Sequence, residues 1–399
     1  MSTRYFFVEP IDVLMLRGNR SFGDAGQHGE ALMPPWPSVF AGAFRSALLA
    51  DDAKRLAVFV AVGSGHFASE SERAERMRDV LGEARFAVLG TPQQPGSFRI
   101  TWASLALAAS DTAWPQAVLP LPADLLVADE PAASPMALLP TALPPGTSGA
   151  STLPMVALLR SRKQVKPAGG HWLDGEGLAA HVRGQLVPST LRTAAVYKTE
   201  TRLGIALNAA SRTASDGAIY TTEAVAFGKH AGFIIGVQGA GDLLRAQGML
   251  RLGGDGKGAR YREVPFDLPA TAGPRDGGRF RLLLTTPAGF SGGWLPTGVV
   301  PEGAQLRLRG AGFSARLACA ALGRHEVVSG WDLAQWRPKA AQRAAPSGSV
   351  YWFDEFEGDS GKLAAWVAGG LWPENGAMSA EQRQRRAEGL NNALLGHWL

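Results

Sequence analysis

Apolar residues in the first part of the chain recur at spacings typical of one strand and one helix. The run from Tyr5 to Leu16 is rich in aromatic and β-branched residues and predicts a buried strand. A polar, glycine-rich loop follows from residue 17 to residue 29. The residues after Ser38 are apolar at helical intervals, so we expect Ser38 to cap a helix. A strand, a long loop and a helix therefore form the first predicted unit.

The pattern then alternates between helical and extended segments. Ser69 and Glu72 have the spacing of a capping box, which predicts a helix that reaches residue 84. The segment from Phe98 to Leu107 predicts a strand. Residues 110–154 are rich in Pro and Ala, so we expect a mostly irregular connection there.

Residues 198–220 have the pattern of an extended β-hairpin. Two apolar arms flank a polar centre that contains the turn-forming pair Asp216 and Gly217. Arg202 and Arg212 would lie on this hairpin or near its tip.

The rest of the chain mixes further strands and helices with glycine-rich loops. Residues 253–258 must form a loop, because so many glycines cost too much entropy inside a regular element. The irregular alternation favours an α+β fold over a doubly wound parallel sheet. The expected strands span residues 233–237, 280–286 and 315–320, and the expected helices span residues 242–250 and 379–388.

Composition limits the class of protein. A chain of 399 residues is long enough for two domains with separate cores, and 46% hydrophobic with 19% charged residues is a globular composition. We place the two domains at residues 1–215 and 216–399. The formal charge of +5 permits an acidic partner, but the placement of the cations must identify it.

The cysteine and histidine content argues against two kinds of site. The single Cys319 excludes an internal disulfide framework and a cysteine-rich zinc site. The seven histidines show no ligand spacing, so we expect no metal and no cofactor. The N-terminal residues lack the features of a signal peptide, and no apolar run is long enough to span a membrane. We therefore expect a soluble, cytoplasmic protein without membrane association.

Cations and aromatic residues are interleaved between residues 329 and 353. Arg337, Lys339 and Arg343 follow Trp331 in a loop that leads into a predicted strand. Cations neutralise phosphates and aromatic faces stack on unpaired bases, so this segment suits RNA. The alternative is an ordinary loop whose tryptophans pack in the core and whose cations are solvated.

Three glycine-containing segments resemble active-site motifs but depart from them. Residues 253–257 resemble a phosphate loop, but Gly258 stands where a magnesium-binding Ser or Thr is required. Residues 310–315 match a dinucleotide motif, but a strand follows them and no helix. Ser291 lies in a nucleophile-elbow motif of hydrolases, yet Pro296 prevents the helix that this motif needs.

His28, in the loop after the first strand, is the candidate for general acid–base chemistry on RNA. The sequence offers it no second catalytic partner. A loop histidine that only hydrogen-bonds its surroundings is the alternative.

The order of short motifs along nearly the whole chain resembles the family of subunit three of the Cmr complex, the type III-B CRISPR effector, in the RAMP superfamily. The motifs are, in order, FFVEPID at residues 6–12, RGNRSFG at 17–23, PPWPS at 34–38, RLGIAL at 202–207, GGDG at 253–256, GWLP at 293–296 and the block from GWD at 330 to SVY at 349–351.

This resemblance implies two ferredoxin-like, RRM-related RAMP domains, the first of which includes the Pro/Ala-rich connection and the hairpin. It implies that the hairpin is a thumb and that the protein is a non-catalytic subunit in antiviral defence. The subunit would grip the 5′ repeat-derived handle of the CRISPR RNA, between the large polymerase-like subunit and the backbone RAMP subunits, with target RNA nearby.

The glycine-rich RAMP loop corresponds to residues 389–396, where Asn391 and Asn392 replace part of the usual glycine pattern. Asparagine tolerates a left-handed backbone, so we expect the loop to keep its shape. The complete set of expected RNA-binding residues is Arg17, Arg20, His28, Arg45, Arg202, Arg212, Lys257, Arg337, Lys339, Arg343, Asn391 and Asn392.

Two enzymatic functions stay open as alternatives. The first is a CRISPR-RNA-processing endoribonuclease of the RAMP superfamily that uses His28. The second, more distant, is a serine hydrolase at Ser291.

Overall fold

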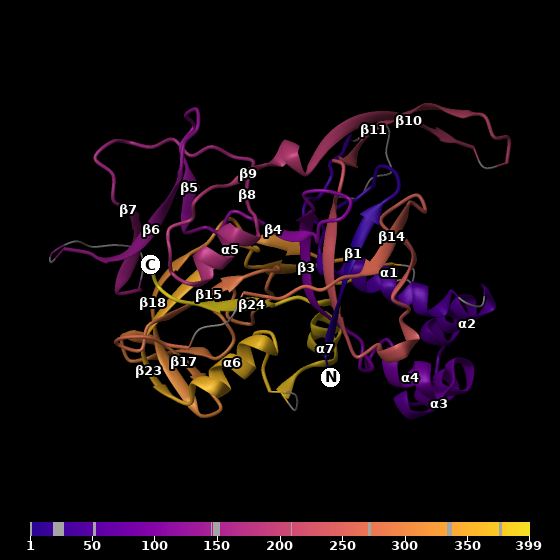
Figure 1. Cartoon of the computed structure of the whole chain (residues 1–399). Coiled ribbons are helices and arrows are strands. Elements are labelled where there is room, and N and C mark those ends of the chain that lie inside the picture. The colour runs from indigo at the N-terminus through magenta and orange to yellow at the C-terminus, as the bar shows by residue number, and fades with distance from the viewer. Residues whose placement is uncertain are drawn as a thin grey trace.

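The computed structural model describes residues 2–18, 28–50, 53–144, 146, 152–208, 210–269, 273–332, 337–374 and 377–399. An 8-stranded antiparallel sheet with the order β13-β14-β1-β12-β3-β4-β8-β9 forms one half of the molecule (Figure 1). Its strands are β1 (Thr3–Pro10), β3 (Arg99–Leu107), β4 (Gln116–Pro120), β8 (His171–Leu173), β9 (Leu191–Arg192), β12 (Ala231–Gln238), β13 (Gln247–Arg251) and β14 (Gly258–Glu263).

A second, 6-stranded antiparallel sheet with the order β16-β17-β18-β23-β15-β24 forms the other half. Its strands are β15 (Phe280–Leu284), β16 (Val299–Glu302), β17 (Gln305–Gly310), β18 (Phe313–Ala321), β23 (Val350–Gly358) and β24 (Ala393–Gly396). Helix α6 (Ser360–Ala368) adds Leu363 and Val367 to the core on one face of this sheet.

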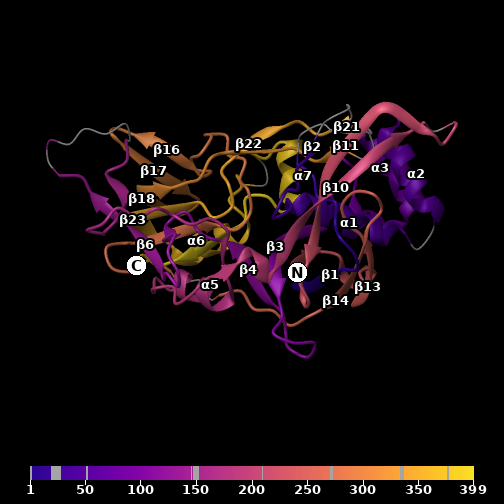
Figure 2. The same cartoon turned by 90° about the horizontal axis from the view of Figure 1, so that it is seen from above.

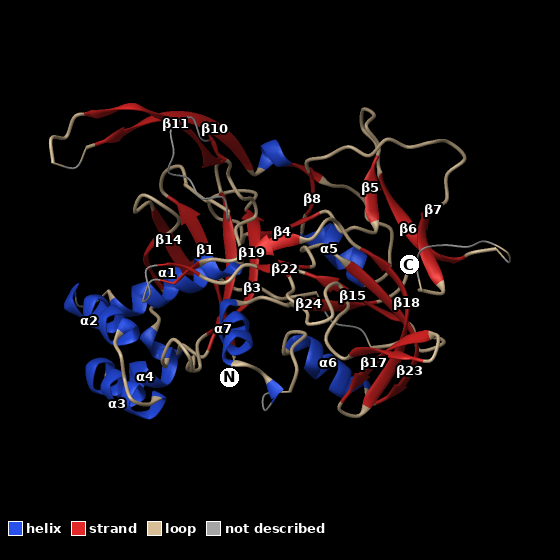
Figure 3. Ribbon diagram, turned by 180° about the vertical axis from the view of Figure 1, so that it is seen from behind, coloured by secondary structure: helices blue, strands red, loops and turns tan. Residues whose placement is uncertain are grey.

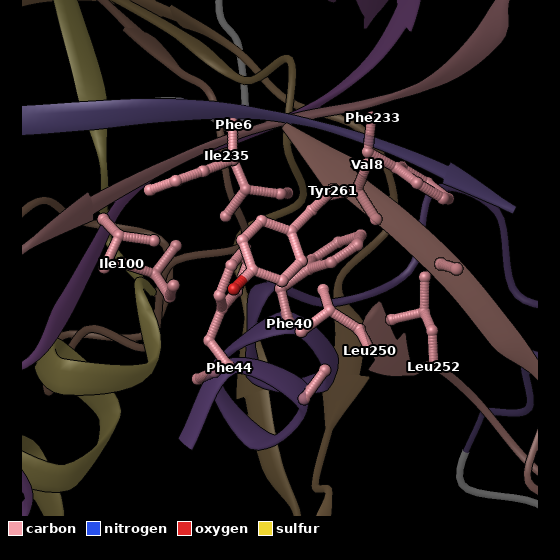
Figure 4. Packing of buried hydrophobic residues seen from close by; sticks show 14 of the residues in the cluster. Phe6, Val8, Phe40, Phe44, Ile100, Phe233, Ile235, Leu250, Leu252 and Tyr261 are labelled. Carbon is pink, nitrogen blue, oxygen red and sulfur yellow. The ribbon is translucent and has the colours of Figure 1, made fainter. Parts of the chain in front are cut away.

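Alternating side chains let the first sheet pack on both faces. In β1, Phe6 and Val8 join the core against α1 (Pro37–Leu49), together with Phe40 of that helix (Figure 4). Phe7, between them in sequence, points to the opposite face and joins a core that also holds Trp352 of the second sheet. The two sheets therefore meet through a shared apolar core.

The helices of the N-terminal part lie at one end of the molecule (Figure 3). They are α1, α2 (Ala53–Ser64), α3 (Glu70–Leu81) and α4 (Glu83–Leu89). Helix α5 (Gly175–Val182) packs near β4, and α7 (Ala380–Glu388) crosses back from the C-terminal part to contact α1 and β3. This return of the chain end brings distant segments together beside α1.

Four smaller sheets complete the described structure. Strands β10 (Tyr197–Leu207) and β11 (Ala214–Phe227) form a long hairpin that extends from the body on the side of α2 and α3 (Figures 1 and 2). Strand β2 (His28–Gly29) pairs with β11. In a separate sheet, β6 (Pro135–Ala142) lies between β5 (Leu125–Val127) and β7 (Met155–Leu159). The two remaining sheets are the pairs β19 (Glu326–Val328) with β22 (Gln342–Ala344) and β20 (Trp331–Asp332) with β21 (Arg337–Pro338).

The predicted α+β class and the hairpin pairing are confirmed by these sheets and helices. Residues 110–154 were expected to be mostly irregular, and most of the described part of this segment lies outside strands, but short apolar runs there form β4, β5 and β6, which were not predicted. The helix expected at residues 242–250 is wrong, since the segment holds a short 3-10 turn and then the edge strand β13.

Two element boundaries differ from the predictions. Strand β1 ends at Pro10, so the predicted strand to Leu16 is too long. Helix α1 begins at Pro37 with Trp36 as its N-cap, because the fixed φ of Pro suits the first helical position, and the expected cap at Ser38 is wrong.

The chain changes from the first sheet to the second between β14 and β15. The predicted domain boundary after residue 215 falls within β11, and β12, β13 and β14 still pair within the first sheet.

Candidate nucleic-acid interface

A groove with a volume of about 810 Å³ lies beside α1, where segments from both ends of the chain meet. The loop after β1, helices α1 and α7, and the segment around residue 330 line it. Among the described residues, the cationic side chains that line this groove are Arg17, Arg45, Arg251 and Lys339. The groove therefore combines cations that lie more than 300 positions apart in the sequence.

Helix α1 has one face for the core and another for the groove. Phe40 and Phe44 are buried against the first sheet. Gly42 and Arg45 line the groove, as expected for positions three apart on one helical face. A Cβ atom at Gly42 would meet nothing within 4 Å, so this glycine leaves open space at the groove wall.

Arg45 is half-buried at the base of the groove. Its guanidinium carbon lies 5.2 Å from the centroid of the Phe98 ring, a cation–π distance. Burial lowers the pKa of Arg45, and the nearby charge of Glu388 opposes this shift. The ring of Phe98 thus holds the Arg45 guanidinium group in place beside α1.

Glu388, at the end of α7, is almost fully buried beneath the groove. It accepts a hydrogen bond from the Lys339 ammonium group and lies 3.5 Å from Nη1 of Arg385. Arg385 also donates to the backbone carbonyl groups of Ser329 and, at 2.8 Å, Ala340. Glu388 and Arg385 therefore fasten the segment around residue 330 to α7, and Lys339 is tied into this ion network.

Apolar side chains supply the rest of the groove surface. Leu56 and Phe59 of α2 and Leu89 of α4 line it beside the aromatic residues Trp36 and Trp331. Trp331 is 52% exposed, so the alternative that places this residue in the core is wrong. A surface with cations and exposed aromatic rings can bind phosphates and stack bases.

A second cavity of about 470 Å³ adjoins the groove, because Pro338 and Lys339 line both. Arg337 and Arg385 add positive charge to its lining, which also includes Asp332 and Glu381. Cationic residues thus line both the groove and, along β21, the second cavity.

The structure places the expected site residues in different parts of the molecule. Arg17, Arg45 and Lys339 meet in the groove, and Arg337 lines the adjoining cavity. Arg202 lies on the hairpin, with Nη2 3.4 Å from Oε2 of Glu200. Their contacts with RNA stay predictions.

The other expected cations lie outside the groove. Lys257 forms an ion pair of 3.0 Å with Asp12. Arg212 is exposed near the hairpin tip, and Arg343 is exposed in β22. Arg20 lies outside the described residues.

The side chains of Asn391 and Asn392 hold their own loop together. Asn391 is fully buried with φ of 61°, the left-handed backbone that the sequence predicted, and its Oδ1 accepts from the Gly289 amide at 2.9 Å. The buried Asn392 donates to the Gly389 carbonyl at 3.0 Å. RNA contact by either side chain therefore disagrees with this burial, because both amides already bond the backbone.

His28 lies in β2, which pairs with the middle of β11, and its side chain is 47% exposed. Its Nδ1 lies 2.9 Å from Oγ1 of Thr221, and its Nε2 lies 3.7 Å from Oε1 of Glu223. The contact with Glu223 was not predictable, because the two residues are far apart in the chain.

Ser291 lacks the following helix that a nucleophile elbow requires. Ser291 lies in a tight turn that bridges Phe290 and Gly293, and no helix begins there. Within the described part of the chain, no group of three or more His, Cys, Asp or Glu residues could hold a metal ion. The described helices are each too short or too polar to cross a bilayer.

Sequence reasoning missed Arg251 and Phe59 as groove residues. Arg251 lies two positions before the glycine-rich turn at residues 253–256, and a cation near such a turn is the signal that could have identified it. Phe59 lies in α2, and only the packing of α2 against the groove reveals its position.

The sequence profile of a family described as CRISPR-associated protein (Cas_Cmr3) matches residues 6–398. No curated protein matches the chain. Among solved structures, a chain of the type III-B Cmr-beta complex bound to cognate target RNA and AMPPnP aligns over 98% of this chain and 96% of its own length, with 12% identity and a TM-score of 0.49. A chain of the same complex bound to cognate target RNA aligns over the same shares, with 12% identity and a TM-score of 0.47. Because the profile match covers nearly the whole chain, the protein belongs to the Cmr3 family of CRISPR-associated proteins.

Proposed function

We propose that the protein is a non-catalytic guide-RNA-binding subunit of a type III-B Cmr effector complex. In this role it grips the 5′ repeat-derived handle of the CRISPR RNA in the groove beside α1. It links the large polymerase-like subunit to the backbone RAMP subunits, with target RNA nearby. Its two sheets with their helices correspond to ferredoxin-like RAMP domains, and the β10–β11 hairpin acts as the thumb.

The observation that carries this proposal is the convergence of Arg17, Arg45, Arg251 and Lys339 with the exposed Trp331 in one groove. The described lining holds four cations and the two carboxylates of Asp332 and Glu388, so cations prevail. Such a groove attracts the backbone of a single strand, and an exposed indole ring offers a stacking surface for an unpaired base. Family membership supports the CRISPR context.

The proposal is tested by the binding of a fluorescently labelled RNA that carries the repeat-derived handle. We expect Arg45→Gln to weaken binding roughly tenfold, because it removes one charge-assisted contact. The slope of log affinity against log salt should decrease in magnitude by about 0.7, the value for one lost phosphate contact on a single strand. Fluorescence anisotropy over a range of salt concentrations measures both quantities.

A second variant, Gly42→Leu, tests the same groove by shape. Open space surrounds Gly42, and Leu favours a helix more than Gly does, so the variant should fold with at least wild-type stability. We expect it to weaken RNA binding by occupying the groove, with a smaller change in salt slope than Arg45→Gln. Arg309→Gln in β17, distant from the groove, serves as the control. Wild-type affinity in both groove variants would contradict the proposed site.

The contact between His28 and Glu223 keeps an endoribonuclease as a second candidate function. An exposed histidine beside a carboxylate has the composition of a general acid–base pair. The discriminating experiment incubates the protein with repeat RNA in the presence of a chelator. A product that disappears in His28→Ala would overturn the non-catalytic proposal, whereas we expect intact RNA with both proteins.

A further inference from the structure

A third hollow, a cleft of about 270 Å³, lies on the other side of α7 from the groove. The segment leading into β3, the end of β12 and α7 line it. Three of its lining residues are arginines, Arg99, Arg383 and Arg386. None of the described residues that line this cleft is acidic.

These arginines concentrate positive charge in one small cleft. All three side chains are partly buried, where charges are less well screened than on an open surface. Burial, and after it the charge of Arg386, lowers the pKa of Arg99 to about 10, so the group stays protonated at neutral pH. Burial also lowers the pKa of Arg386.

Backbone contacts hold two of the guanidinium groups in place. Arg99 donates to the Ala368 carbonyl at 3.3 Å, at the last residue of α6. Arg383 donates to the Met378 carbonyl at 2.7 Å. Each of these bonds uses one nitrogen of a group with several donors, so donors stay available for an anion.

The cleft adjoins the groove at one residue. Pro95 lines both, and α7 separates them. Gln384 and Glu388 of α7 line the groove, whereas Arg383 and Arg386 line the cleft. A nucleic-acid strand that leaves the groove past Pro95 would meet the three arginines next.

We propose that this arginine cleft binds a backbone phosphate of the same RNA strand that occupies the groove. The guanidinium fork matches the geometry of phosphate oxygens, and the negative charge of a phosphate complements three neighbouring guanidinium groups. Adjacency to the groove favours RNA over an acidic segment of a partner protein. The inference rests on the proposed function, because it assigns a second contact to the same strand.

The test uses the full chain and the labelled handle RNA in the same anisotropy measurement. Arg383→Gln and Arg386→Gln should each weaken binding about 5- to 10-fold and reduce the salt slope by about 0.7. Arg386→Lys should keep the slope and lose part of the affinity, because it retains the charge without the fork. Arg76→Gln, an exposed helical arginine of α3 that lines none of the three hollows, is the matched control and should bind as wild type.

A second measurement replaces single phosphates of the RNA with neutral methylphosphonates. One position should weaken binding to the wild type and have no further effect on Arg386→Gln, because the same contact is already lost. This pairing identifies an RNA contact even if a variant is less stable than the wild type.

The outcomes separate this inference from the proposed function. If Arg45→Gln loses affinity while both cleft variants bind as wild type, the cleft proposal is wrong and the groove proposal stands. If these cleft variants keep RNA affinity but lose a partner subunit in pull-down assays, the cleft binds an acidic protein segment and the RNA proposal is overturned. If the wild type binds no RNA, both proposals fail.

Discussion

Lys339 is a cation that the sequence predicts to bind phosphate and that forms an internal ion pair in the structure. The sequence favours it as a phosphate ligand because it follows two tryptophans and an arginine. In the structure its ammonium group is paired with the buried Glu388, which Arg385 also approaches. Lys339 therefore lines the groove while stabilising the segment that forms it, and its charge is partly neutralised.

We expect Glu388→Gln to lower the free energy of unfolding by about 3–5 kcal/mol, because it leaves Lys339 and Arg385 in a buried site without their carboxylate. Urea denaturation followed by fluorescence measures the change. Glu302→Gln is the comparison, since it breaks the exposed ion pair with Arg309 and should cost less than about 1 kcal/mol. Equal losses in the two variants would contradict a structural role for Glu388.

At the scale of elements, α7 is the helix on which the groove and the arginine cleft both depend. Ser379 and Gln382 form a capping box at its start, and Gly389 ends it in the left-handed conformation. The sequence predicted this helix from its polar, arginine-rich pattern, and the structure confirms it. Its packing against α1 and β3 was not predictable, because those contacts join opposite ends of the chain.

Ser379→Ala should cost about 1 kcal/mol of stability, because it removes the hydrogen bond that caps α7. We also expect a small loss of RNA affinity, since α7 carries residues of both proposed contacts. Ser379→Thr keeps the hydroxyl and should lie much closer to the wild type in thermal unfolding. Identical midpoints for the two variants would show that the cap contributes little.

The sequence predicted the strand pairing of the hairpin, but it did not predict how exposed the side chains of the hairpin are. Its apolar arms suggest burial, yet Leu203 is 74% exposed and Ile205 is 45% exposed. Both point to the same side of the β10–β11 ribbon, which extends away from the body (Figure 1). Local alternation sets strand pairing, but only the surrounding chain decides whether a face is covered.

On the scale of the whole molecule, a buried ionic cluster joins the two halves beside their shared apolar core. His181 of α5 lies 2.8 Å from Asp124, and Arg281 of β15 donates to the same carboxylate at 2.7 Å. Burial by itself would raise the pKa of Asp124, but the charges of His181 and Arg281 hold it below its ordinary value. Burial lowers the pKa of His181 below 6.5, although Asp124 opposes this shift.

This cluster predicts a loss of stability in weak acid. With its folded pKa below 6.5, His181 binds fewer protons than the unfolded chain does, so the free energy of unfolding should fall as the pH decreases below about 6.5. His171 and His397 act in the same direction, because burial lowers their pKa values too. Protonation of Asp124 lowers the free energy of unfolding further only when the pH falls below about 3.8, the ordinary pKa of an aspartate.

Urea denaturation at a series of pH values measures this dependence, which is at most about 1.4 kcal/mol per pH unit for each proton. His181→Gln should show a weaker dependence than the wild type between pH 6.5 and 5. His66→Gln, which changes an exposed histidine, should follow the wild type. If the free energy of unfolding of His181→Gln depended on pH as strongly as that of the wild type, His181 would not be the source of the dependence.

The sequence by itself determined the α+β class, the hairpin, several strands and helices and, through the order of its motifs, the family resemblance. These features follow from local periodicity, turn residues and capping residues, which act over a few positions. The groove and the cleft were decided by tertiary structure, because α1, α7, the loop after β1 and the segment around residue 330 meet only when the C-terminal part packs on the first sheet. Packing also decided which expected cations meet: it placed Arg45 beside Lys339, tied Lys339 to Glu388 and buried the two asparagines.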